Sequence, residues 1–153
     1  MKKIMFVCHG NICRSPTAEF VMKDIVKKAG KENEYLIRSA ATSTEALNCH
    51  VYYPAKRELE KRGIKTDDRR AVQVQPDDYD KYDLFVIMDE RNEFNLLKRF
   101  GGRDDKGKIK KLLDFTPDGG DVADPWYTDR FDIAFDQIYC GCDALFAYLE
   151  RKS

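Results

Sequence analysis

Short runs of apolar residues alternate along the chain with longer stretches in which apolar side chains recur three or four positions apart. A short apolar run predicts a buried strand, whereas the longer spacing predicts a helix with one buried face. Strands are therefore expected over residues 4–7, 35–39, 84–88 and 109–115. Helices are expected over residues 17–28, 54–62 and 90–100, each ending near a glycine, and over a long C-terminal stretch from Phe131 to Leu149.

The alternation of strand and helix signals is typical of a parallel sheet whose strands are joined by helical crossovers. The nearly continuous apolar run at residues 84–88 indicates a strand that is buried on both faces. The chain has 153 residues, enough to bury one core, and shows no internal repeat or linker. We therefore predict a single α/β domain over residues 1–153, with a four-stranded, doubly wound parallel sheet and helices on both faces.

The segment directly after the first expected strand carries the most informative residues. It reads Cys8-His9-Gly10-Asn11-Ile12-Cys13-Arg14-Ser15-Pro16. With Ser15 as the N-cap and Pro16 at the first helical position, a helix is expected to begin at its end. The segment is then a tight loop between a strand and a helix. Because its backbone N–H groups converge at the helix N-terminus, it can bind a dianion.

Two side chains in this loop carry the expected chemistry. The thiol of Cys8, close to a helix N-terminus and to a cation, is expected to be a nucleophilic thiolate at neutral pH. The planar guanidinium of Arg14 can bind two phosphoryl oxygens. Gly10 lets the backbone turn inward, Asn11 tolerates a left-handed conformation, and Ser15 is expected to donate to the Cys8 sulfur. The pattern indicates transfer of a phosphoryl group to Cys8.

This loop resembles the signature of the low-molecular-weight protein tyrosine phosphatases, Cys-x-Gly-Asn-x-Cys-Arg-Ser-x. Three further stretches at family-like spacing extend the resemblance over nearly the whole chain: Ser39-Ala40-Ala41-Thr42-Ser43, Met88-Asp89-Glu90 and Asp124-Pro125-Trp126-Tyr127. The resemblance implies a flavodoxin-like fold and hydrolysis of phosphotyrosine and small aryl phosphates through a cysteinyl-phosphate intermediate, without a metal or another cofactor. Phosphotyrosine-containing proteins or peptides would be the substrates, and inorganic phosphate would be the product.

The resemblance also assigns the general acid. Asp124, held by the proline that follows it, would protonate the leaving group. Composition alone does not separate it from Asp118, Asp121 and Asp129, which are more simply loop or capping residues.

The substrate pocket is expected to have aromatic walls. Trp126 and Tyr127 would flank an aryl phosphate, although aromatic residues at this position could also pack against the sheet edge. Ile12 supports phosphotyrosine, because related phosphatases that act on phosphoarginine carry threonine there. Glu45 falls where many relatives place an aromatic wall, which puts the affinity for aromatic substrates in question.

Other loop positions have specific expectations of their own. Cys13 is expected either to trap an oxidised Cys8 as a reversible disulfide or only to pack as a small residue. His9 replaces the commoner leucine and could change the rim of the pocket. Relatives often carry a histidine near Arg69 and Arg70 that supports the loop, so that support is here missing or made differently.

Composition limits which cellular compartments and which binding partners are expected for the protein. The chain has 27 basic and 27 acidic residues, and a net charge of zero argues against nucleic acid as the main partner. No apolar run approaches the roughly 20 residues needed to span a bilayer. Five cysteines without a secreted disulfide framework, and without the spacing of a metal site, favour a reducing cytoplasmic setting. A monomer is expected.

Two other functions are compatible with parts of the pattern. An arsenate reductase shares this fold and loop but needs two further relay cysteines, and Cys49, Cys140 and Cys142 are not placed for such a relay. A phosphopeptide-binding module without catalysis would not need Cys8, Arg14 and Asp124 together. Arsenate-dependent thiol oxidation would identify the first alternative, and turnover of an aryl phosphate would exclude the second.

Overall fold

The computed structural model describes residues 1–152, so residue 153, the end of the expected domain, lies outside the described part. Its centre is a four-stranded sheet in the order β2-β1-β3-β4, with every pair of neighbouring strands parallel. The strands are β1 (Lys2–Cys8), β2 (Tyr35–Ala41), β3 (Leu84–Ile87) and β4 (Ile109–Lys111). The prediction of a four-stranded, doubly wound parallel sheet is confirmed.

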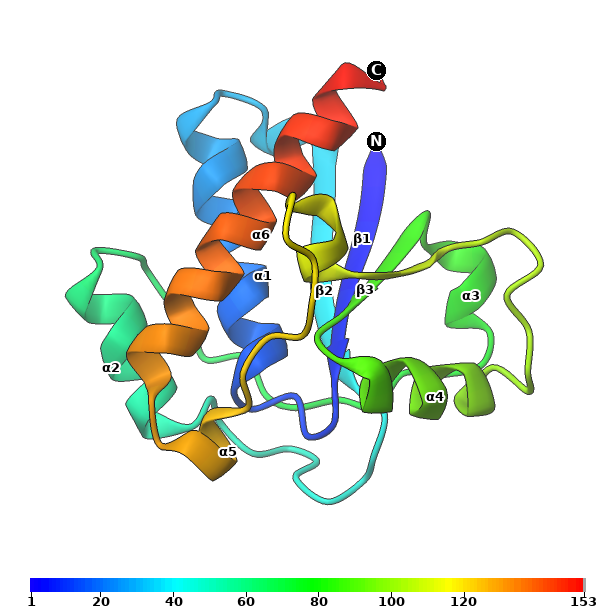
Figure 1. Ribbon diagram of the computed structural model, residues 1–153, viewed down its shortest axis with the longest axis horizontal. Coiled ribbons are helices and arrows are strands. Elements are labelled where there is room, and N and C mark those ends of the chain that lie inside the picture. Colours follow the sequence, from blue (N-terminus) through cyan, green and yellow to red (C-terminus); the bar gives the residue numbers. More distant parts are fainter. Residues whose placement is uncertain (153) are drawn as a thin grey trace.

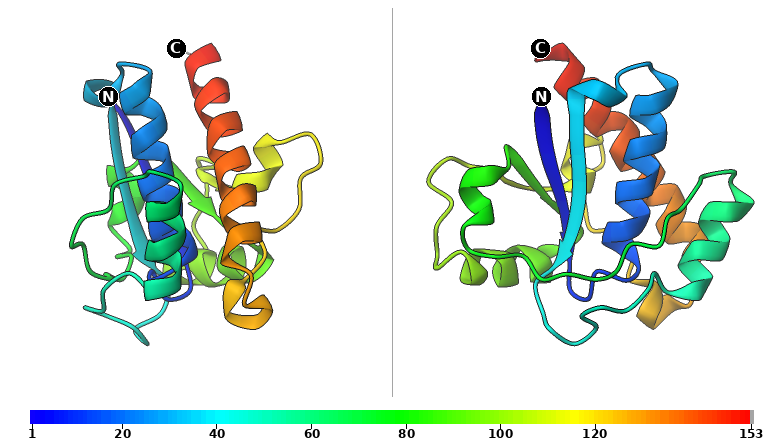
Figure 2. Two further views of the ribbon diagram at one scale, coloured as in Figure 1. Left: turned by 90° about the vertical axis from the view of Figure 1, so that its left-hand side faces the viewer. Right: turned by 180° about the vertical axis from the view of Figure 1, so that it is seen from behind.

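Helices cover both faces of the sheet (Figure 1). One face carries α1 (Arg14–Lys28) and the long α6 (Phe131–Arg151), and the other carries α3 (Asp78–Lys81) and α4 (Glu90–Arg99). The short helices α2 (Tyr53–Lys61) and α5 (Pro125–Thr128) lie near the end of the molecule to which β1 points (Figures 1 and 2). Short 3₁₀ turns at Glu32–Glu34 and Leu112–Phe115 complete the described elements.

Strand β1 lies at the centre of the sheet, and its side chains alternate between two cores. Ile4, Phe6 and Cys8 face the core under α1 and α6, whereas Met5 and Val7 face the core under α3 and α4. The chain crosses from β1 to β2 on one side and later returns to β3 on the other. The carboxyl end of β1 is therefore the switch point of the sheet, where α/β proteins bind ligands.

The fourth strand is shorter than the apolar pattern predicts. We expected a strand over residues 109–115, but β4 ends at Lys111, and Leu112–Phe115 forms a 3₁₀ turn. Lys111 pairs with Ile87, the last residue of β3, so no partner strand continues beyond it. The turn instead packs Leu112 against α6 at Gly141, where an added Cβ would lie 2.5 Å from Leu112 Cγ.

The start of the first long helix also differs from the prediction. Helix α1 begins at Arg14, and its N-cap is Cys13, which makes no side-chain capping hydrogen bond. The assignment of Ser15 as the N-cap is therefore wrong. Ser15 lies inside the first turn, where its hydroxyl contacts the Cys8 sulfur instead of a backbone N–H. Helices α3 and α5 were not predicted, because four residues are too few to show a helical apolar period.

Candidate active site

Cys8 ends β1, and the loop that follows it folds back around its sulfur. Because residues 8–15 are expected to bind a phosphoryl group, we call them the phosphate-binding loop. The backbone N–H of Asn11 donates to Cys8 Sγ at 3.3 Å, and the hydroxyl of Ser15 lies 2.9 Å from the same sulfur. Asn11 has a φ of 59°, the left-handed conformation that turns its N–H inward. The backbone N–H groups of Thr42 and Ser43 bind the carbonyls of Cys8 and His9, which ties the loop to the end of β2.

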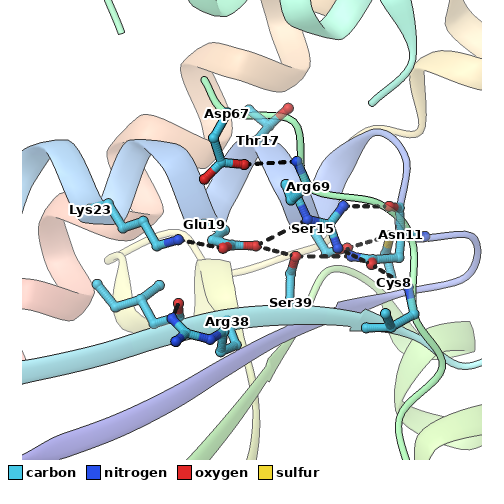
Figure 3. Close-up of polar contacts among 12 residues, drawn as sticks. Cys8, Asn11, Ser15, Thr17, Glu19, Lys23, Arg38, Ser39, Asp67 and Arg69 are labelled. Atoms are coloured by element: carbon cyan, nitrogen blue, oxygen red, sulfur yellow. Dashed lines mark hydrogen bonds and ion pairs between the residues drawn. The ribbon is translucent and has the colours of Figure 1, made fainter. Parts of the chain in front are cut away.

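A buried polar network supports the loop from behind (Figure 3). The side-chain amide of Asn11 donates to Ser15 Oγ at 2.8 Å and to Ser39 Oγ at 3.0 Å. Ser39, which lies on β2, donates in turn to Glu19 on α1. Asn11, Ser15, Ser39 and Glu19 are all buried, so each of these hydrogen bonds is shielded from water. The network therefore fixes the strained Asn11 backbone.

Arg69 completes this network from a distant part of the chain. One nitrogen of its guanidinium donates to the Asn11 backbone carbonyl at 3.0 Å and another donates to Asn11 Oδ1, while Nε lies 3.6 Å from Glu19 Oε1. Burial lowers the pKa of Arg69, whereas the charges of Glu19, Asp67 and Cys8 act in the opposite direction. The loop support expected to be missing or made differently near this position is thus made by an arginine.

Arg14 is held rigidly at the other end of the phosphate-binding loop. Its Nη1 donates to Asp89 Oδ2 at 2.8 Å and to the carbonyl of Val122 at 3.0 Å, and its Nη2 lies 3.4 Å from Asp124 Oδ2. Burial acts to lower the pKa of Arg14, but the charges of Cys8, Asp89 and Asp124 outweigh it and the pKa is raised. The same contacts offset the cost of a cation in the first turn of a helix.

Two elements, β3 and α4, fix the position of the Asp89 side chain. It follows β3, the neighbour of β1, and it is the N-cap of α4, where Oδ1 accepts from the N–H of Asn92 at 2.8 Å. The other carboxylate oxygen then binds Arg14. Asp89 therefore orients the guanidinium, a role that was not predicted from the sequence.

Asp124 lies at the mouth of the site as the N-cap of α5. Oδ1 accepts from the backbone N–H of Trp126 at 3.0 Å, which leaves Oδ2 directed towards Arg14. The neighbouring aspartates have other roles. Asp121 binds Lys111 at 3.0 Å, and Asp129 takes the left-handed conformation that ends α5. The structure thus brings Asp124, and not these two aspartates, to Arg14.

The rim beyond Asp124 is aromatic and exposed. The side chains of Trp126 and Tyr127 are 68% and 76% exposed, so neither belongs to the core. The ring of Tyr52 lies 5.7 Å from the ring of Trp126 and 5.9 Å from that of Phe131, measured between centroids. Tyr52 joins the expected wall, and its position after a long loop gave no signal in the sequence.

The two departures from the family pattern, His9 and Glu45, meet on the other side of the loop. His9 Nε2 lies 2.8 Å from Glu45 Oε2, and both side chains are exposed. Ser43 holds the same rim, because its hydroxyl donates to the His9 carbonyl at 2.9 Å. Glu45 therefore does not project freely into an aromatic pocket but pairs with a residue of the phosphate-binding loop.

The cysteines are all free thiols in this structure. Burial, followed by the proximity of Cys8, raises the pKa of Cys13. Cys142 is buried in the core between α6 and α1, with its sulfur 3.7 Å from the carbonyl of Ala18, whereas Cys49 and Cys140 are exposed. Within residues 1–152, no three His, Cys, Asp or Glu side chains are grouped so that they could hold a metal ion. No helix in this part of the chain is long and apolar enough to cross a membrane.

Comparisons with known proteins agree with this geometry. The model of the family described as low molecular weight phosphotyrosine protein phosphatase matches residues 3–153. The low molecular weight protein-tyrosine-phosphatase YfkJ of Bacillus subtilis (strain 168) is 34% identical over 154 residues, covering 99% of this chain and 98% of that protein. The low molecular weight phosphotyrosine protein phosphatase of Gallus gallus is 37% identical over 144 residues, covering 93% of this chain and 89% of that protein.

Solved structures show the same likeness. The crystal structure of YfkJ from Bacillus subtilis superimposes with a TM-score of 0.96 at 34% identity, covering 100% of this chain and 97% of that chain. A protein tyrosine phosphatase from Entamoeba histolytica, crystallised with Hepes in the active site, gives a TM-score of 0.90 at 30% identity. That match covers 99% of each chain.

Proposed function

Since the chain belongs to the low molecular weight phosphotyrosine protein phosphatase family, we propose that it hydrolyses phosphotyrosine in proteins and peptides, with Cys8 as the nucleophile. One observation carries the assignment of Cys8. Its sulfur lies at the switch point of the sheet, contacted by the N–H of Asn11 and the hydroxyl of Ser15, in a loop closed by the immobilised guanidinium of Arg14. An anion bound in that loop would meet the thiolate directly.

In the first step, the Cys8 sulfur attacks phosphorus, an S–P bond forms, and the bond from phosphorus to the tyrosine oxygen breaks. The loop N–H groups and Arg14 bind the phosphoryl oxygens as charge spreads over them. Because Asp89 and the Val122 carbonyl already fix the guanidinium, it needs little reorganisation to do so. Asp124 gives its proton to the departing phenolate.

In the second step, water attacks the phosphocysteine. Asp124, now a carboxylate, takes a proton from that water, the S–P bond breaks, and Cys8 returns to the thiolate as inorganic phosphate leaves. The hydroxyl of Ser15, 2.9 Å from the sulfur, can donate to the thiolate as it forms. Apart from the substrate and this water, the groups used in the two steps belong to this chain.

The rim supports an aromatic substrate. The exposed rings of Trp126 and Tyr127 stand beside Asp124, where they can flank the ring of a phosphotyrosine. Peptides that carry phosphotyrosine, phosphoserine or phosphoarginine in one sequence context test this preference. Phosphotyrosine should be hydrolysed fastest, and faster turnover of phosphoarginine would overturn the assignment.

No observation favours arsenate reduction. Of the cysteines outside the phosphate-binding loop, Cys142 is buried in the core, and burial raises its pKa. Cys49 and Cys140 are exposed, and neither contacts the loop through a hydrogen bond in the described part of the chain. The free thiols support the proposal of a reducing, cytoplasmic setting. We also propose a monomer built from one domain.

Oxidation should inactivate the enzyme reversibly through Cys13. Peroxide would convert the Cys8 thiolate to a sulfenic acid, and the Cys13 thiol would displace water from it to form a disulfide, which a dithiol reduces. In Cys13→Ser, inactivation by peroxide should persist, but recovery with dithiothreitol should fall sharply. Phosphate should protect both forms by occupying the loop. Full recovery of Cys13→Ser would show that Cys13 only packs.

Removing the cation behind the loop should slow catalysis. In Arg69→Ala, the Asn11 carbonyl loses its donor and Glu19 loses a cation, so kcat/KM should fall by about 10- to 100-fold. Arg69→His should keep more activity at low pH and lose it as the pH rises through about 6.5, because only the protonated ring can replace the guanidinium.

Arg70 provides the matched control for this substitution. It is the adjacent arginine, but it is exposed, and its guanidinium donates to the Asn48 carbonyl, at 3.4 Å, instead of to Asn11. Arg70→Ala should therefore stay within about twofold of the unaltered enzyme. A pH–rate profile for Arg69→His that matches the unaltered profile would contradict a charge-dependent role for Arg69.

A further inference from the structure

A basic hollow opens beside the phosphate-binding loop, on the side away from α5. Its volume is about 410 Å³, and it is lined by His9, Thr42, Ser43, Asn95, Lys98 and Arg99. In Figures 1 and 2, the segment that follows β2 begins next to α4 at the carboxyl end of the sheet, whereas α5 lies on the opposite side of the loop after β1. The hollow therefore adjoins the proposed catalytic site through His9, the residue next to Cys8.

The hollow carries two cations, Lys98 and Arg99, and its lining residue His9 pairs with the carboxylate of Glu45. Neutral oxygens hold Arg99 in place: Nε donates to the Val74 carbonyl at 2.8 Å, and Nη2 donates to the side-chain carbonyls of Gln73 and Gln75 at 3.2 and 3.3 Å. Lys98 is exposed. Within residues 1–152 neither cation is ion-paired, and no carboxylate lies among the lining residues. The two charges sit in the last turn of α4, where the helix dipole favours cations.

The hydrogen-bonding groups around these charges suit an anion. Asn95 and Thr42 line the same hollow, and among residues 1–152 the buried Oγ1 of Thr42 has no hydrogen-bond partner. The wall towards the catalytic site is fixed, because Ser43 donates to the His9 carbonyl through both its N–H and its hydroxyl. A fixed guanidinium, an exposed ammonium and an amide are groups that can bind a carboxylate or a phosphate.

We propose that this hollow is a substrate subsite that binds an anionic group flanking the phosphotyrosine, with Lys98 and Arg99 as its specificity-determining residues. The proposal rests on the proposed function, because it needs the phosphotyrosine to be held at Cys8. With the phosphate in the phosphate-binding loop and the tyrosine ring beside Trp126 and Tyr127, the peptide backbone must pass over the edge of the catalytic site. Neighbouring side chains that point away from α5 then reach the hollow.

Peptide kinetics test the subsite. Peptides with a central phosphotyrosine and one glutamate, glutamine, lysine or phosphoserine at each flanking position are compared by kcat/KM. The best glutamate position should exceed glutamine at the same position by about fivefold, the size of a partly exposed ion pair, and lysine should be worse than glutamine. Phosphoserine at that position distinguishes the two sources of anion: a larger gain than with glutamate assigns a phosphate, and an equal or smaller gain assigns a carboxylate.

Substitutions then locate the charge. In Arg99→Gln, the ratio of kcat/KM between the glutamate and glutamine peptides should fall towards one. In Lys98→Glu, the same ratio should fall below one. Lys27→Glu is the matched control, because Lys27 is an exposed lysine at the far end of α1, and its ratio should equal that of the unaltered enzyme. The ratio is used because it cancels any change in folding or in the chemical step.

The outcomes separate this inference from the proposed function. Turnover of phosphotyrosine peptides at equal rates, whatever the flanking residue, would overturn the subsite and leave the phosphatase assignment intact. An acidic preference that survives in both Lys98→Glu and Arg99→Gln would also overturn it. Absence of turnover with every phosphotyrosine peptide would overturn the proposed function and the subsite together.

Discussion

Cys8→Ser is expected to abolish hydrolysis while phosphate still binds. A serine hydroxyl beside the loop has no general base to activate it, because the neighbours of this atom are the Asn11 N–H and the Ser15 hydroxyl, which serve as donors to a thiolate. We expect kcat for p-nitrophenyl phosphate to fall by about 10⁵-fold or more, as for other removed nucleophiles. The affinity for inorganic phosphate, measured by calorimetry, should change by no more than a few-fold.

The control for this substitution is Cys140→Ser, which changes an exposed thiol on α6 and should keep full activity. Retention of even about one per cent of kcat in Cys8→Ser would show that another group is the nucleophile. An unactivated serine hydroxyl would react far more slowly than that, even with Arg14 and Asp124 in place. Loss of phosphate binding together with activity would instead show that the substitution had disrupted the loop.

Asp124→Asn is expected to slow the reaction most when the leaving group is poor. Asparagine can still accept from the Trp126 N–H and cap α5, so the substitution removes the proton donor and preserves the local structure. For phenyl phosphate, whose phenolate needs protonation, kcat/KM, which reports the first step and not the later hydrolysis of the phosphocysteine, should fall by about 10²- to 10³-fold. For p-nitrophenyl phosphate, whose leaving group is stable as an anion, the fall should be much smaller.

Asp121→Asn is the matched control, because Asp121 lies in the same segment but pairs with Lys111. Its kinetics on both substrates should stay close to those of the unaltered enzyme. An equal fall of kcat/KM on both substrates in Asp124→Asn would mean that Asp124 is not the general acid and acts through its contact with Arg14.

The parts of the site that lie within one short segment could be predicted from the sequence. Cys8, Asn11 and Arg14 belong to a single loop between a strand and a helix, so their spacing alone places them around one anion. The order of strands and helices could be predicted for the same reason, since a period of two or of 3.6 residues is a local property. The ends of strands and helices were harder to predict. Strand β4 ends where its partner β3 ends, and this pairing is visible only in the folded sheet.

The supporting residues could not be predicted, because folding brings them from distant positions. Arg69 is 58 residues from Asn11 and Asp89 is 75 residues from Arg14 along the chain. The sequence gives a charge at each of these positions but not its partner. Asp89 had the better signal, since a carboxylate directly after the strand next to β1 must lie at the same edge of the sheet. The N-cap prediction for Ser15 was wrong for a related reason. A hydroxyl near the start of a helix can cap the helix or bind another side chain, and the sequence does not show that the Cys8 sulfur lies within reach.

The central claim is that phosphate passes through the Cys8 sulfur, and rapid-quench mass spectrometry tests it most directly. The enzyme is mixed with an excess of p-nitrophenyl phosphate, quenched within the first turnovers in acid, and digested. The peptide that contains Cys8 should carry one added phosphoryl group on sulfur during turnover and lose it when the substrate is exhausted. Phosphate found on another residue, or a Cys8 peptide that stays unmodified while a burst of p-nitrophenol is released, would contradict the mechanism.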